Sequence, residues 1–143
     1  MSYALDVTIL LHASDTASPH HGMAAVFLDR CASEKEVCCL TWGTVMDYLR
    51  MSTHGAIFAS PLAPEEATRN ITNLLRLPHV RVLSAGEGFW DVFRAVTNDM
   101  ALRGNLVTDA YLAALLCQHD VRVLYTNDAD FRKFAFLDVR NPL

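Results

Sequence analysis

Three aspartates stand where a carboxylate has little access to water. Asp6 interrupts an apolar run over residues 3–11, Asp109 begins a long apolar segment, and Asp128 directly follows another. Aspartate is seldom fully buried, because taking an unpaired carboxylate out of water is costly or raises its pKa until the group is neutral. The placement of these three residues therefore points to a polar site inside an apolar framework.

Each of the three also has a purely structural explanation. Asp6 can cap the turn that follows the first strand, and Asp109 can complement a helix dipole behind a Thr108 cap. Asp128 can lie in a turn or cap the next helical turn. A functional site is favoured by position, because Asp6 and Asp128 each end a predicted strand, and ligands gather beyond the carboxyl ends of parallel strands.

Two further aspartates complete the candidate site. Asp47 lies off the apolar stripe of its helix, and an exposed ion pair with Arg50 explains it equally well. Asp130 follows Asp128 by two residues in the same polar segment. Local context places neither aspartate in a site as firmly as it places Asp6, Asp109 and Asp128.

Carboxylates that share a small space repel each other and must bind a proton or a cation. Oxygen ligands without cysteine or histidine suit Mg²⁺, with Mn²⁺ as an alternative. Mg²⁺ takes one or two direct carboxylates, keeps several waters and binds substrate phosphate, which is the chemistry of phosphodiester hydrolysis. We therefore expect Asp6, Asp109 and Asp128 to hold Mg²⁺.

The apolar pattern predicts the elements that must position these side chains. A strand that runs into a helical turn is expected over residues 3–11, with further strands at 37–40, 80–83 and 122–125. Helices are expected over 23–31, 42–51, 64–77, 88–102 and 108–119, with a helical turn at 128–134. The 42–51 helix should present one core-facing stripe, made of Trp42, Val45, Met46 and Leu49. This alternation predicts one α/β domain over residues 1–143, with a mostly parallel sheet flanked by helices on both faces.

Composition limits the remaining possibilities. The net charge of −4 argues mildly against a protein that binds nucleic acid through a broad basic surface. It does not exclude nucleic acid, because a bound divalent ion can supply positive charge. No apolar run approaches the roughly 20 residues of a membrane helix, and a secretion signal is absent, so we expect a cytoplasmic protein. The four cysteines include no Cys-x-x-Cys pair and are expected to be reduced core thiols rather than a zinc site.

Four segments together resemble the PIN-domain ribonucleases. They are Leu-Asp-Val-Thr-Ile-Leu-Leu at 5–11, Val-Thr-Asp-Ala at 107–110, Thr-Asn-Asp-Ala-Asp-Phe at 126–131 and the ending Asn-Pro-Leu. The stretch 42–53 with its Leu49-Arg50 pair, the Gly-Asn-Leu lead-in at 104–106 and the Asn-Pro-Leu ending resemble bacterial VapC-type toxins in particular. The resemblance covers essentially the whole chain, in the family's order and spacing.

The resemblance implies a PIN-like nuclease domain and a Mg²⁺-dependent endoribonuclease, the toxin of a type II (VapBC-like) toxin–antitoxin system. It implies that Asp6, an acid at position 47, Asp109 and Asp128 form the catalytic site, with Asp130 nearby. It also implies a structured RNA substrate such as tRNA or rRNA, a cognate antitoxin and a homodimer. Thr8 would supply a hydroxyl that orients Asp6.

Two other readings of the same residues remain open. A catalytically silent α/β module could use the acidic pocket to hold metal or a partner's basic arm, and Asp47 and the negative net charge favour it. An aspartyl-phosphate phosphatase would also place an aspartate at the end of the first strand. That enzyme needs a second aspartate two residues later, where this chain has Thr8.

Overall fold

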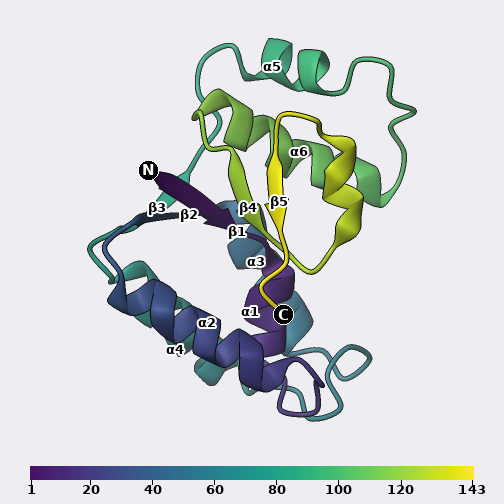
Figure 1. Ribbon diagram of the computed structural model, residues 1–143. Helices are drawn as coiled ribbons and strands as arrows, with labels where there is room; N and C mark the ends of the chain where they lie inside the picture. The colour runs from purple at the N-terminus through teal and green to yellow at the C-terminus, as the bar shows by residue number, and fades with distance from the viewer.

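The computed structural model describes all 143 residues and contains a five-stranded sheet in which every strand pair is parallel (Figure 1). The strand order is β3-β2-β1-β4-β5, with β1 (Ser2–Leu5) at the centre. Its neighbours are β2 (Val37–Thr41) and β4 (Val123–Tyr125), and the edges are β3 (Val80–Leu83) and β5 (Asp138–Arg140). The predicted parallel sheet is confirmed.

Six α-helices and one short 3₁₀ helix connect the strands. They are α1 (Val7–Ser14), α2 (His21–Ser33), α3 (Trp42–Ser52), α4 (Pro64–Leu75), α5 (Phe89–Val96), α6 (Asn105–Gln118) and the 3₁₀ helix η1 (Ala129–Lys133). Helices α1 to α4 cover one face of the sheet, and α5 and α6 cover the other (Figure 1). No helix combines the length and the apolar character that a membrane span requires.

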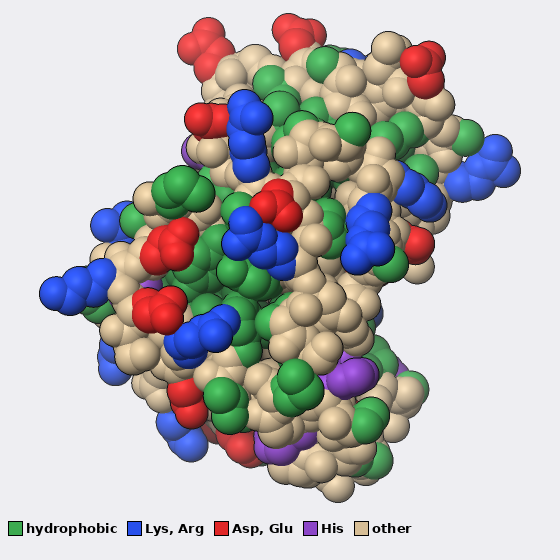
Figure 2. Space-filling view, in the orientation of Figure 1, with side chains coloured by type: hydrophobic (Ala, Val, Ile, Leu, Met, Phe, Trp, Pro, Cys, Tyr) green, Lys and Arg blue, Asp and Glu red, His purple; other side chains and the backbone are tan.

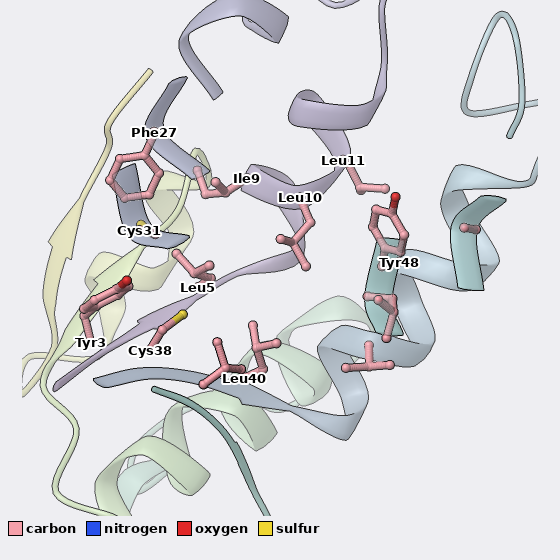
Figure 3. Close-up of a cluster of buried hydrophobic side chains, with 14 of the residues drawn as sticks. Tyr3, Leu5, Ile9, Leu10, Leu11, Phe27, Cys31, Cys38, Leu40 and Tyr48 are labelled. Atoms are coloured by element: carbon pink, nitrogen blue, oxygen red, sulfur yellow. The ribbon is translucent and has the colours of Figure 1, made fainter. Parts of the chain in front are cut away.

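Side chains of the central strands alternate between two apolar cores. Tyr3 and Leu5 of β1 pack beneath helices α1 to α4, in the cluster drawn in Figure 3, while Ala4 belongs to the core on the opposite face. The adjacent Cys38 and Cys39 of β2 divide between the two cores in the same way. Both faces are therefore buried, which explains why these strands are apolar throughout.

Helix α6 forms most of the second core. Residues Ala110 and 112–116 are buried, so the helix is covered around most of its circumference. Phe131 and Phe134 pack into the same core from the C-terminal segment. The expectation that this helix is central is confirmed, and its packing fixes Asp109 relative to the sheet.

The apolar stripe predicted for α3 is partly wrong. Val45 is buried, but Trp42 and Met46 are 49% and 54% exposed. The buried face includes Thr44 and Tyr48 instead, because their hydroxyl groups find hydrogen-bond partners inside the protein. Helical spacing alone predicts that all four apolar side chains face the core, whereas Trp42 and Met46 lie at the surface.

Other details of the secondary structure also differ from expectation. The helix predicted at 88–102 ends at Val96, the one predicted at 64–77 ends at Leu75, and β5 was not expected. Strand β5 has only three residues, two of which are charged, so no apolar run marks it. Three cysteines are buried as expected, but Cys117 is exposed on α6.

Packing of α6 gives a direct test of the fold. Leu116→Ala is expected to lower the free energy of unfolding by about 2–5 kcal/mol, because the leucine is fully buried and its removal leaves a cavity. The corresponding fall in Tm is roughly 5–15 °C. Val26→Ala, at an exposed position of α2, should change the free energy by no more than about 0.5 kcal/mol. Thermal unfolding followed by circular dichroism measures both, and equal Tm values for the two variants would contradict this packing.

Candidate active site

Asp6 lies at the carboxyl end of the central strand. Its backbone N–H donates to the carbonyl of Tyr125, at the end of β4, over 3.0 Å. Asp6 is the residue before α1, and its carboxylate makes no side-chain capping hydrogen bond to that helix, although the backbone N–H groups of Val7 and Thr8 lie close enough to lower its pKa. The side chain is instead buried and directed to partners on other segments.

Two threonine hydroxyls hold the Asp6 carboxylate. Thr8 and Thr126 both donate to Asp6 Oδ2, over 3.0 and 2.7 Å. Each hydroxyl oxygen also accepts a backbone N–H from the loop after β4: Thr126 accepts from Asp128 over 2.9 Å, and Thr8 accepts from Asn127 over 3.0 Å. The network therefore ties the first strand's carboxylate to the backbone of the loop that carries Asp128. Sequence reasoning assigned no role to Thr126, whose only signal is a hydroxyl residue directly after an apolar strand.

Asp109 lies just over one turn inside α6, which begins after Gly104 at a positive φ of 58°. The predicted helix start at residue 108 is wrong, because α6 already begins at Asn105. The alternative of a Thr108 cap therefore does not hold, and the Thr108 hydroxyl donates to the Asn105 carbonyl over 2.9 Å. No acidic residue lies in the first turn of α6, so the helix dipole is a weak explanation for Asp109.

The acidic side chains act on one another. Partial burial raises the pKa of Asp109 to about 6, and the negative charges of Asp128, Asp6 and Asp130 contribute further, in that order. Lys133 lowers this pKa and so also lies within electrostatic reach. Burial likewise raises the pKa of Asp6, although the Thr126 and Thr8 hydroxyls oppose the shift by stabilising the charged form. Asp109 therefore lies within electrostatic reach of three other carboxylates, which come from two distant segments of the chain.

Asp128 and Asp130 have local roles as well. Asp128 is the N-cap of η1, and its Oδ1 accepts the Asp130 backbone N–H over 2.9 Å. The purely structural explanation of Asp128, that it caps a helical turn, is therefore correct as far as it goes. The same carboxylate also raises the pKa of Asp109. Because the cap occupies Oδ1, it fixes the direction of the carboxylate rather than removing it from the site.

Asp47 is placed differently from the other four. It lines the same pocket as Asp6 and Asp109, but its Oδ1 accepts from Arg50 Nη2 over 3.3 Å, in the ion pair considered as its structural explanation. Its charge is not among those that shift the pKa of Asp109. The structure thus brings Asp47 to the pocket without joining it to the electrostatic cluster.

The pocket has a volume of about 570 Å³ and two kinds of wall. Its polar side includes the carboxylates of Asp6 and Asp109 and the hydroxyl groups of Thr41 and Thr44. Its remaining lining is mostly apolar and comes mainly from α3, α5 and α6, with Val7 of α1 and Phe131 of η1. Thr41 caps α3 by accepting the Thr44 backbone N–H over 3.2 Å, which fixes both hydroxyls beside the pocket.

The donor set fits a hard divalent cation. The converging side chains offer oxygen atoms, and mutual repulsion raises the cost of leaving them without a positive charge. No three acidic, histidine or cysteine side chains form a ready-made metal cluster. Mg²⁺ needs only one or two direct carboxylates and keeps water as its other ligands. It therefore suits these carboxylates better than a metal ion that takes all its ligands from the protein.

Surface charge around the fold is mixed. Figure 2 shows Lys and Arg side chains dispersed among Asp and Glu on one face of the molecule, rather than gathered into a single basic stripe. Binding to a polyanion would therefore depend on local contacts more than on a broad positive surface.

Comparison with known proteins places the chain in a family. The PIN domain model matches residues 3–137. Over 142 residues the chain is 40% identical to Ribonuclease VapC48 of Mycobacterium tuberculosis, covering 99% of this chain and 98% of that protein. Ribonuclease VapC43 of the same organism is 30% identical over 139 residues, with 97% and 94% covered.

Solved structures support the same fold at lower sequence identity. The VapBC2 structure from Rickettsia felis, bound to a DNA fragment from its promoter, matches with a TM-score of 0.70 at 14% identity, covering 99% of this chain and 98% of the other. VapC20 of Mycobacterium tuberculosis, described as a sarcin–ricin loop cleaving toxin, matches with a TM-score of 0.67 at 17% identity, with 96% and 98% covered. The chain therefore belongs to the PIN-domain family and, within it, to the VapC ribonucleases.

Proposed function

We propose that this chain is the toxin of a VapBC-like toxin–antitoxin system and that it cleaves RNA at a Mg²⁺ site held by Asp6, Asp109 and Asp128. The observation that carries the assignment of the site is the convergence of carboxylates from the end of β1, from α6 and from the loop after β4. Membership of the VapC ribonucleases supplies the reaction, which is hydrolysis of RNA phosphodiester bonds.

The protein's own groups have separable tasks in this proposal. Asp6 is held by Thr8 and Thr126 in one orientation, so its position is set before any ligand arrives. Asp109, with a pKa raised to about 6, loses its proton readily at neutral pH and is then available as a ligand. A divalent ion bound here supplies positive charge for the phosphate and lowers the pKa of water for in-line attack.

Asp130 and Asp47 would orient water rather than hold the ion directly. Asp130 contributes to the raised pKa of Asp109, which places it within reach of the cluster. Asp47 lines the pocket, and because Arg50 contacts only its Oδ1, the other carboxylate oxygen is left to orient water.

Substrate and partners are proposed from the relatives. VapC20 is described as cleaving the sarcin–ricin loop, and a structured RNA such as rRNA or tRNA is the substrate class we propose here. The VapBC2 complex supports a cognate antitoxin for this chain, and we propose that the toxin forms homodimers. A basic side chain from the antitoxin would be attracted to the same carboxylates that we assign to the metal.

The alternative is an acidic binding module without catalysis. The ion pair of Asp47 with Arg50 and the absence of a ready-made metal cluster are the observations in its favour. Incubation of the purified protein with structured RNA, in Mg²⁺ or in EDTA, separates the two functions. Cleavage that EDTA abolishes supports the nuclease, and intact RNA in both conditions supports the silent module.

Removal of either central carboxylate should abolish cleavage. Mutation of a residue that only hydrogen-bonds to a metal ligand typically lowers activity by roughly 10- to 100-fold. Asp6→Asn and Asp109→Asn each alter a proposed ligand itself, so each is expected to lower the cleavage rate by more than this. Asp120→Asn is the matched control, because Asp120 is exposed and its positive φ of 55° suits asparagine. Cleavage of labelled RNA in Mg²⁺ measures the effect, and full activity in both site variants would overturn the assignment.

The raised pKa of Asp109, caused first by burial and then by its acidic neighbours, predicts a pH-dependent stability. Its folded pKa of about 6 lies above the unfolded value of about 3.9, so its contribution favours folding at low pH and is lost as the pH rises from about 4 to 6. In EDTA at pH 7.5, Asp109→Asn should therefore be more stable than the parent chain by about 1 kcal/mol, a figure reduced for the partial exposure of the carboxyl group. Thermal unfolding at pH 4 and pH 7.5 measures it. An equal gain at both pH values would indicate another cause.

Thr126 should act as a positioning residue. Thr126→Val removes the hydroxyl that donates to Asp6 and accepts from Asp128, and is expected to lower the cleavage rate by roughly 10- to 100-fold. Thr126→Ser keeps the hydroxyl and should restore most of the activity. A purely structural role would instead make the two variants equally active once both are folded, as judged by circular dichroism.

A further inference from the structure

Four aromatic side chains form one wall of the pocket. We call them the aromatic wall: Phe89, Trp90 and Phe93 of α5 and Tyr111 of α6. The Trp90 ring stacks on Phe93 with centroids 5.5 Å apart and planes 15° apart, and Phe89 meets Tyr111 edge to face at 5.5 Å. These contacts hold the rings in place on the protein side, so the wall is organised without a ligand.

Two rings of the wall are exposed in the single chain. Trp90 is 64% exposed and Tyr111 is 39% exposed, and the exposed Met46 and Val107 line the same pocket. Phe93 covers one part of the Trp90 indole, and the rest of the Trp90 side chain is largely exposed to solvent. Exposed apolar groups gathered at one concave place, unlike single scattered ones, mark a binding surface.

Position connects this wall to the acidic cluster. Asp6 and Asp109 line the same pocket as Trp90 and Tyr111, so one cavity of about 570 Å³ combines a polar, acidic side with an aromatic side. A nucleotide has the same division, with a charged phosphate at one end and a flat base with apolar faces at the other. If the phosphate lies at the carboxylate site, the neighbouring base falls within the pocket that the aromatic wall bounds.

We propose that the aromatic wall stacks an unpaired base of the RNA next to the phosphate that is cut, with Trp90 as the main stacking surface. This inference rests on the proposed function, because it takes the carboxylates as the place of the phosphate. A base inside a duplex has its faces covered by neighbours, whereas a base in a loop or bulge can be turned out onto an aromatic ring. This requirement agrees with the loop that VapC20 is described as cleaving, and the new element is the assignment of Trp90 as the surface that holds the base.

Stacking makes a quantitative prediction for cleavage. Trp90→Ala should lower kcat/KM for a loop-containing RNA by roughly 10- to 100-fold, and Trp90→Phe should retain most of it, because any aromatic face can stack. Val26→Ala, which removes an exposed apolar group of α2 outside the pocket, should have no effect. The rise in Tm produced by Mg²⁺ alone should be the same in Trp90→Ala as in the parent chain, since the carboxylates are unchanged.

Binding can be measured without cleavage. The chain has two tryptophans, so Trp42→Phe combined with Asp109→Asn gives a protein whose only indole is Trp90 and whose catalysis is disabled under the proposed function. Oligouridylate should quench the Trp90 fluorescence, whereas an abasic ribose–phosphate chain of equal length should not. Equal quenching by the two chains, or none by either, would overturn the stacking proposal.

The outcomes separate this inference from the proposed function. Wild-type kcat/KM in Trp90→Ala overturns the stacking role while leaving the nuclease in place. Base-dependent quenching in a protein that never cleaves RNA supports the stacking surface and refutes the nuclease assignment. If Trp90→Ala instead weakens self-association in analytical ultracentrifugation and leaves cleavage unchanged, the wall is an interface between two copies of the chain, and the proposal is wrong.

Discussion

The buried carboxylate of Asp6 is the constraint on which the site depends. A charge at the end of the central strand can be accommodated only if polar groups reach it, and two hydroxyl groups do so. Both come from residues whose own oxygens accept backbone N–H groups of the loop after β4. The same two hydroxyl groups that make the burial of Asp6 tolerable therefore also hold the backbone of the loop that carries Asp128. Because the strands are parallel, these groups and the N-terminal part of α6 all meet at one edge of the sheet.

Much of the framework could be predicted because its physical cause is local in the sequence. Continuous apolar runs mark strands that are covered on both faces, and they located β2 and β3 closely and β1 and β4 to within a few residues. The positions of Asp6 and Asp128 followed from the same pattern, since each comes directly after such a run. Asp109 was found as a charge at the start of an apolar segment, although its helix begins earlier than expected, at Asn105.

Other features depend on contacts that no local pattern records. The hydrogen bond from Thr126 to Asp6 joins residues 120 positions apart. Although Thr126 begins a segment that resembles the family, its residue type and local position do not reveal that it contacts Asp6. The spacing of α3 predicted that Trp42 and Met46 face the core, yet both are exposed because Thr44 and Tyr48 take inward positions with satisfied hydroxyls. The short, charged β5 pairs with β4 through its backbone, and so leaves no apolar signal.

The two sides of the pocket depend on each other physically. Carboxylates alone attract cations but give no discrimination among phosphodiesters, because every nucleotide carries the same phosphate. Aromatic surface alone binds any flat apolar ligand and has no preference for a cleavable bond. The packing of α5 on α6 brings both kinds of surface into one cavity, since Asp109 and Tyr111 lie two residues apart on α6 and Phe89 contacts Tyr111 from α5. A shift of α5 would therefore move Phe89, Trp90 and Phe93, while Tyr111 stays on α6 and Asp6 stays held by its threonines.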